Sequence, residues 1–306
     1  MTITHTIFFN RPAHQLVNDH LSLTVVPSLA GRVMELTVGE KNFLWINEPL
    51  LEGAKVKGWK NWGGYKTWIA PQSKWKKIDL PDEQMDQSEW QIVGVADSAA
   101  AASIELRSPL IKWAGVVLSR RITLRAREAK IFIREAMLNV SATNQTWALW
   151  GVAQFPVPGY ATFPNDAIKN IRKLHGKPHE FKAKKLKFDG DSKWKVGALI
   201  AAEGWGTYQA KGWRGGITVR FPASPNHPHA DESNLEAWSN SNPDYMELEW
   251  LSPLMTLKPG EERFFDDLTI IMVEIRDSMI AQVEKKNIVA SGDPKAVEEF
   301  KINSSN

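Results

Sequence analysis

The feature that most constrains the fold is a series of short segments rich in β-branched and aromatic residues. Gly, Pro, Asn or Asp bound many of them, as is typical of β-strands. Because no helical periodicity is interleaved among them, the pattern favours an all-β sandwich or barrel over a parallel α/β sheet. The predicted strands are residues 21–26, 32–38, 90–95, 103–107, 117–124, 130–138, 147–153, 196–201, 216–221, 235–239, 245–251 and 264–274.

Helical periodicity is convincing only near the end, at residues 277–286 and 294–301, which predicts a helical tail over about 277–306. No repeat, linker or low-complexity tract is evident, so we expect one domain over residues 1–306. A length of 306 residues exceeds that of a plain sandwich and indicates an enlarged one.

Composition excludes several kinds of site. The chain has no cysteine, which rules out disulfides, thiolate catalysis and cysteine-ligated metal clusters. It has no apolar run of about 18 residues and no signal-peptide pattern, so we expect a cytoplasmic protein with no membrane span. Its net charge of +3 is close to balance.

The unusual count is 14 Trp against 4 Tyr, and five Trp lie between residues 45 and 75, which we expect to form an irregular functional loop. Within it, Gly63-Gly64 predicts a turn with positive φ that lets a ligand approach the backbone. Trp62 and Trp68 offer flat apolar faces, while Lys66 and Gln72 add polar partners, a mixture that suits a sugar. The alternative is that both indoles belong to the core.

Two acids lie close together at Tyr245-Met246-Glu247-Leu248-Glu249-Trp250. On a strand, residues two apart share a face, so Glu247 and Glu249 would sit side by side with Tyr245. Two neighbouring carboxylates repel and raise one pKa, which suits a general acid or base. The alternative is a solvated strand face that carries two acids.

Weaker candidates accompany this strand. Glu236 and Asn240 would reach the same cleft if the segments at 235–239 and 245–251 form a hairpin, and Trp150 with Gln154 could line a pocket or simply pack. A His-x-His pattern at His227-Pro228-His229 is too weak to predict a metal site. We expect no metal and no cofactor.

A basic stretch, residues 165–188, carries eight Lys or Arg and also reads as an irregular loop. The stretch has few aromatic residues, and the net charge of the whole chain is close to zero. These features favour a solvated face over nucleic-acid binding, so we expect no nucleic-acid partner. The other interpretation is that it steers an anionic ligand, with Lys66 and Arg214 as contacts.

Three segments, in order, resemble the galactose-mutarotase-like superfamily. Residues 28–33, followed by Gly39 and Leu44, resemble its opening strands; residues 62–68 resemble its His-Gly-Gly sugar-binding turn; residues 246–249 and then 257–261 resemble the strand with its catalytic Glu and the Leu-x-Pro-Gly-Glu turn. Together they span about residues 20 to 275. The variant Gly-Gly-x-Lys-x-Trp-x-Ala-Pro-Gln is similar to a bacterial branch of unassigned function.

The resemblance implies a β-supersandwich whose concave face holds a monosaccharide unit, with Glu249 in the place of the mutarotase base. The chain departs from the family pattern at two acid positions. Trp62 stands where mutarotases have His, and residues 148–153, which replace the segment with the acid His, contain none. Mutarotation needs an acid as well as a base, so the reaction stays open.

These patterns predict carbohydrate recognition in a concave cleft, by an aldose-1-epimerase-like or related sugar-processing enzyme with Glu249 as base and Glu247 as second acid or hydrogen-bond partner. The alternatives are a binding module without turnover, a protein for anionic sugars such as uronates or phosphosugars, and a structural or interaction protein. The ligand would be a mono- or oligosaccharide, and the sequence leaves the oligomeric state open. The predicted substrate-binding residues are Arg32, Trp62, Lys66, Trp68, Gln72, Trp150, Gln154, Arg214, Glu236 and Asn240.

Overall fold

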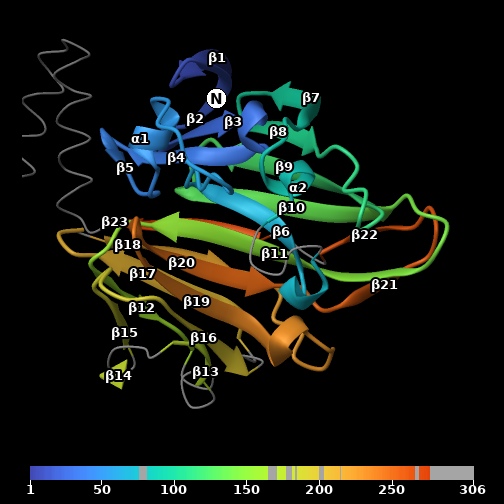
Figure 1. The fold of residues 1–306 in the computed structure, drawn as a ribbon. Coiled ribbons are helices and arrows are strands. Elements are labelled where there is room, and N and C mark those ends of the chain that lie inside the picture. Colours follow the sequence, from blue (N-terminus) through green and yellow to red (C-terminus); the bar gives the residue numbers. More distant parts are fainter. Residues whose placement is uncertain are drawn as a thin grey trace, which may run out of the picture.

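The computed structural model describes residues 1–75, 81–164, 171–176, 181–182, 185–199, 203–213, 215–265 and 269–275. These residues form two large antiparallel sheets that pack as a sandwich, which confirms the predicted all-β class (Figure 1). The α-helices among them are single turns, α1 (Glu48–Leu51) and α2 (Glu83–Asp86). None of the helices in the described ranges is long and apolar enough to cross a membrane.

The first sheet has 12 strands, and both halves of the chain contribute to it. Ten strands follow one another across it: β1 (Thr2–Phe8), β2 (Arg11–Val17), β3 (Ser22–Val26), β4 (Arg32–Val38), β6 (Tyr65–Ala70), β11 (Gln145–Phe155), β20 (Asp244–Leu251), β19 (Ser233–Ser241), β16 (Trp194–Leu199) and β13 (Ile171–His175). Two short strands pair beside this path, β5 (Lys41–Asn42) on β4 and β21 (Met255–Leu257) on β11.

The second sheet has 11 strands and is built in the same way. Its order is β14 (Phe181–Lys182), β15 (Lys185–Phe188), β12 (Gly159–Thr162), β17 (Trp205–Ala210), β18 (Gly215–Arg220), β23 (Thr269–Ile275), β10 (Lys130–Asn139), β9 (Val116–Arg125), β8 (Ala101–Arg107) and β7 (Gln91–Asp97), with β22 (Glu262–Phe264) on β10. In Figure 1 the blue and teal strands β1 to β5, β7 and β8 gather at one end, β12 to β19 lie at the other, and β6, β11 and β20 run between them.

Strand β6 connects the core to the site. Tyr65 and Thr67 point to the second sheet, where both side-chain hydroxyls donate to the buried carboxylate of Glu135. Arg120 also pairs with Glu135, with 3.1 Å between Nε and Oε1. Because side chains alternate along a strand, Lys66 and Trp68 point to the opposite face of the first sheet.

The structure corrects two expectations about irregular loops. Within residues 45–75, residues 65–70 form the fully buried strand β6 rather than a loop, and Gly63-Gly64 is the turn before it. A Cβ on Gly63 would lie 2.4 Å from the carbonyl oxygen of Trp45, so neighbouring backbone, not a ligand, requires glycine there.

The described parts of residues 165–188 are likewise strands β13, β14 and β15. The segment predicted as one strand at 264–274 begins at the last residue of β22 and includes most of β23. The sequence pattern did not predict β1, β2, β5, β12, β17, β21 or β22. The predicted helical tail lies outside the described residues.

Candidate functional site

A cleft of about 620 Å³ lies on the face of the first sheet that points away from the second. Six adjacent strands form its floor, in the order β6, β11, β20, β19, β16 and β13. The lining residues are Trp59, Trp68, Gln72, Trp75, Pro81, Trp150, Leu174, His175, Lys193, Lys195, Asp231, Trp238, Asn240, Tyr245, Glu247 and Glu249. The site therefore combines five indoles with charges of both signs.

Strand register brings these residues together from distant parts of the sequence. Gln154 lies opposite Glu247, Glu247 opposite Trp238, Trp238 opposite Lys195, and Lys195 opposite His175. Directly opposed residues of an antiparallel pair share one face of the sheet. β19 also pairs with β20, which meets the condition under which Glu236 and Asn240 were expected to reach the cleft.

Glu247 is held by two donors. The amide Nε2 of Gln154 donates to its Oε1 at 2.7 Å, and Nζ of Lys66 donates to the same oxygen at 3.2 Å. Burial lowers the pKa of Lys66, and the charge of Glu247 opposes this shift. Oε1 of Glu247 therefore has two buried donors, one of them an ammonium group.

Glu249, two residues along β20, shares its cation with another acid. The Nζ of Lys195 lies 3.1 Å from Oε2 of Glu249 but 2.5 Å from Oε2 of Glu236, and all three groups are largely buried. Indole Nε1 of Trp150 also donates to Oε2 of Glu249, at 2.8 Å.

The ammonium group of Lys195 carries one positive charge and cannot neutralise the carboxylates of both Glu236 and Glu249. The shared cation therefore affects the pKa values of this cluster. Burial raises the pKa of Glu249 to about 8, and the charges of Glu236 and Glu247 raise it against the opposing effect of Lys195. Burial disfavours the charge of Lys195, but the two carboxylates outweigh it and raise its pKa. Glu249 therefore holds its proton more tightly than an ordinary carboxyl group does.

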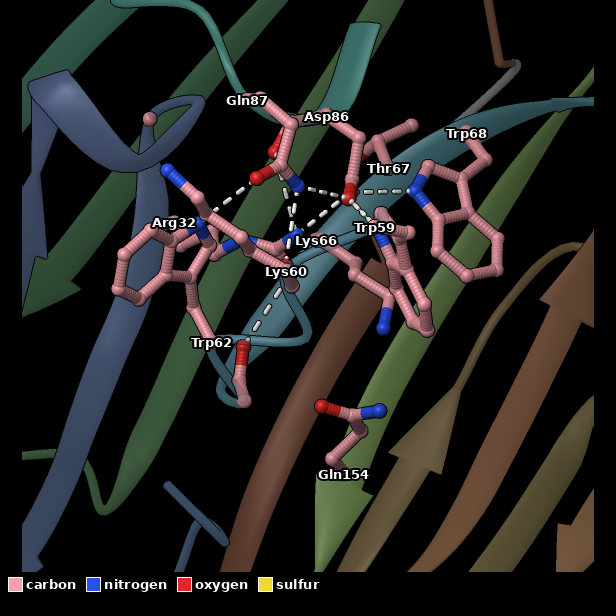
Figure 2. Close-up of polar contacts among 12 residues, drawn as sticks. Arg32, Trp59, Lys60, Trp62, Lys66, Thr67, Trp68, Asp86, Gln87 and Gln154 are labelled. Atoms are coloured by element: carbon pink, nitrogen blue, oxygen red, sulfur yellow. Dashed lines mark hydrogen bonds and ion pairs between the residues drawn. The ribbon is translucent and has the colours of Figure 1, made fainter. Parts of the chain in front are cut away.

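Asp86, at the end of α2, orients one wall of the cleft (Figure 2). Its Oδ1 accepts from Nη2 of Arg32 at 2.5 Å and from Nε1 of Trp68 at 2.6 Å. Its Oδ2 accepts from Nε1 of Trp59 at 2.5 Å and from Nε2 of Gln87 at 2.8 Å. One buried carboxylate thus fixes two indoles that line the cleft.

The indoles of this wall pack against one another. The ring of Trp68 meets those of Trp75 and Trp150 edge to face, with centroids 5.6 and 5.3 Å apart. The indole N–H of Trp75 donates to the carbonyl of Ile69 at 2.8 Å. Since the N–H groups of Trp59, Trp68, Trp75 and Trp150 all donate within the protein, the wall offers the cleft an apolar surface.

The structure separates the predicted site residues into three groups. Those that line the cleft are Trp68, Gln72, Trp150, Asn240, Glu247 and Glu249. Lys66, Gln154 and Glu236 do not line it but contact the charged groups that do.

Arg32 and Trp62 lie away from the lining. Arg32 is the buried partner of Asp86, and Trp62 donates to Oε1 of Gln87 at 3.1 Å and packs in a separate apolar cluster with Phe8. Arg214 lies outside the described residues.

Sequence reasoning missed several residues of the site, of which Lys195 and Asp86 matter most. An indirect signal existed for Lys195, because three acids predicted to share one cleft require a nearby cation. Trp59 and Trp75 belong to the tryptophan-rich segment that was expected to be functional, but no pattern marked Asp86 or Trp238 as members of the site. Within the described residues, no group of three or more His, Asp or Glu side chains is placed to hold a metal ion.

Comparisons with known proteins identify the fold. No protein-family model and no curated protein matches the sequence. A galactose mutarotase-like protein from Clostridium acetobutylicum is 12% identical with a TM-score of 0.56, covering 89% of this chain and 97% of that one. Another galactose mutarotase-like protein, from Lactobacillus casei, is 12% identical with a TM-score of 0.57, covering 86% of this chain and 100% of that one.

A larger protein contains the same fold. A TPR-domain-containing protein from Parabacteroides distasonis is 13% identical with a TM-score of 0.63, over 86% of this chain. The match spans only 47% of that protein. Together these likenesses confirm, at the level of fold, the resemblance that was found in the sequence.

Proposed function

We propose that this chain, which has the galactose-mutarotase-like fold, binds a neutral sugar in the cleft and moves protons on it through Glu249 and Glu247. The observation that carries the proposal is the contrast between these two carboxyl groups. They lie two residues apart on β20, in one cleft, yet Glu247 accepts from an ammonium and an amide while Glu249 shares its cation. Neighbouring groups whose environments differ in this way are the usual form of an acid and base pair.

The lining suits a sugar. Trp68, Trp75 and Trp150 are almost fully buried, so Trp59 is the indole of the wall that can cover the C–H face of a pyranose ring. The amides of Gln72 and Asn240 can both donate to and accept from hydroxyl groups. The lining charges oppose one another, with Lys193 and Lys195 against three carboxyl groups. Such a balance favours a neutral polyol over a uronate or a phosphosugar.

The reaction that fits is interconversion of sugar anomers. Glu247 takes the proton of the anomeric hydroxyl while Glu249 donates a proton to the ring oxygen. The ring C–O bond breaks and the anomeric carbon becomes a carbonyl. Closure on its other face returns both protons and gives the second anomer.

This assignment reverses the roles in the sequence-based hypothesis, which made Glu249 the base. A carboxyl group with a pKa of about 8 is protonated at neutral pH and can donate. The family's acid histidines are missing from the sequence, and Glu249 would supply that acid. Whether the protein turns a sugar over is the point that the assay must decide.

The test combines binding and turnover on one panel: glucose, galactose, mannose, xylose, glucuronate and glucose 6-phosphate. Calorimetry measures binding, NMR exchange between anomers measures interconversion, and product analysis on methyl glycosides measures bond cleavage. We expect Glu249→Gln and Glu247→Gln to lose about 100-fold or more in rate and to keep binding within a few fold. The control variant Glu105→Gln, on β8 and outside the cleft, should change neither the rate nor the binding.

Three outcomes would contradict parts of the proposal. If the wild type binds a sugar but neither interconverts nor cleaves it, the protein is a binding module. If glucuronate or the phosphosugar binds more tightly than its neutral analogue, the charge argument is wrong. If no sugar of the panel binds, the carbohydrate function itself is wrong.

A further inference from the structure

The cleft is longer than one sugar ring. Its lining residues come from six adjacent strands, from Trp68 on β6 to His175 on β13. Five spacings of about 4.8 Å between neighbouring strands give a floor roughly 24 Å across. A pyranose ring covers about one such spacing, so a single ring over Glu247 and Glu249 leaves much of the floor uncovered.

The carboxyl pair lies inside this floor and not at its end. Both acids belong to β20, the third of the six strands. The indole wall, from Trp59 to Trp150, lies on the β6 and β11 side. On the other side lie Trp238 of β19 and His175 of β13, whose ring centroids are 5.7 Å apart with an interplanar angle of 36°.

Trp238 has the features of a platform for a second ring. Along β19 its side-chain neighbours on the same face, Glu236 and Asn240, are buried, whereas Trp238 is only partly buried. Its indole therefore remains partly exposed inside the cleft, and Lys193 and Asp231 lie along the same lining. A partly exposed ring flanked by polar groups is what a carbohydrate covers when it stacks.

We propose that the Trp238–His175 end of the cleft is a second sugar subsite, and that the ligand is an oligosaccharide of at least two pyranose rings. The inference rests on the proposed function and names its substrate class. The cleft volume of about 620 Å³ supports it. Pockets of roughly 300–1,000 Å³ enclose drug-sized ligands, which are larger than a single hexose.

The experiment compares matched sugars of increasing length. Calorimetry would use three series of one to three rings: β-1,4-linked glucose, α-1,4-linked glucose and β-1,4-linked galactose. In the series that binds, we expect affinity to rise about tenfold from one ring to two, because the second ring stacks on Trp238. Trp238→Ala should lose this gain and keep the affinity for the single ring within about threefold.

Two further variants separate stacking from a loss of structure. Trp238→Phe keeps an aromatic face and should keep most of the gain. Trp205→Ala removes another partly buried indole, from β17 in the other sheet and outside the cleft, and should leave both affinities unchanged.

Each result decides a different claim. Equal affinity for one, two and three rings in the wild type would overturn the subsite and leave the proposed function standing. A gain with length that survives in Trp238→Ala would overturn its assignment to this end of the cleft. Failure of every sugar to bind would overturn both proposals.

Discussion

The contacts of Asp86 make a quantitative prediction about the stability of the site. Asp86→Asn keeps the shape of the side chain but removes the charge that faces Arg32, whose side chain is fully buried. Each carboxylate oxygen accepts from two of four donors, so the oxygen that the amide nitrogen replaces leaves two donors without their acceptor. The wild-type arrangement cannot survive this change unaltered.

The size of the effect follows from burial. Removing one partner of a buried ion pair typically costs about 3–5 kcal/mol, because the remaining charge is left without compensation. The chain offers a matched comparison in Arg121 and Glu105, whose Nη2 and Oε2 atoms are also 2.5 Å apart. Those side chains are 55% and 28% exposed. An exposed pair contributes only about 0–1 kcal/mol, which sets the expectation for Glu105→Gln.

Urea unfolding of the wild type, Asp86→Asn and Glu105→Gln would measure the two losses side by side. We expect the free energy of unfolding to fall several times further in Asp86→Asn. Sugar binding should also weaken in that variant, because Trp59 and Trp68 lose their common acceptor. If both variants lose the same free energy, or Asp86→Asn loses less than about 1 kcal/mol, burial does not control this ion pair and the reasoning fails.

Two further predictions concern the pKa of Glu249 and the turn before β6. Folding raises the pKa of Glu249 from an ordinary 4.5 to about 8, so the folded protein keeps a proton that the unfolded chain releases. The free energy of unfolding should therefore decrease as pH rises across that interval, by at most about 1.4 kcal/mol per pH unit. In urea unfolding measured at several pH values, Glu249→Gln should flatten this dependence on pH. An unchanged dependence would contradict the raised pKa of Glu249. A Cβ on Gly64, at φ +75°, would lie 2.4 Å from the carbonyl oxygen of Val33, whereas Gly58 has φ +86° and open space around it. Gly64→Ala and Gly58→Ala share a backbone strain of roughly 1–3 kcal/mol. Because of the added clash, Gly64→Ala should lower the free energy of unfolding clearly more than Gly58→Ala does. Equal melting temperatures for the two variants would refute the steric argument.

Local patterns predicted the features that depend on neighbouring residues. The two-residue spacing of Glu247 and Glu249 placed both acids on one face of a strand, and both line the cleft. Glu236 and Asn240 were expected near these acids if residues 235–239 and 245–251 formed a hairpin, and β19 does pair with β20. These inferences needed only strand periodicity and turn chemistry.

Features that depend on distant partners escaped the sequence. The Trp-rich, Gly-containing segment at 45–75 predicts a loop, whereas residues 65–70 form the buried strand β6. A partner 181 residues away, Glu247, explains the buried Lys66 on that strand. Arg32 was predicted to contact the ligand, but its side chain pairs with Asp86 instead. Neither partner carries a local signature, because a long-range ion pair leaves no periodic trace in the sequence.

The same separation in sequence has a consequence for biosynthesis. Lys66 meets Glu247 only after 181 further residues have been added, and Gln154 meets it after 93. At roughly 5–20 residues per second, the interval for Lys66 is on the order of 10–40 seconds on the ribosome. During that time the ammonium group has no native carboxylate to pair with, so the face of β6 that carries Lys66 stays solvated. The acid pair therefore cannot be assembled on a nascent chain that ends before β20, and a truncated product would keep the N-terminal strands without any working cleft.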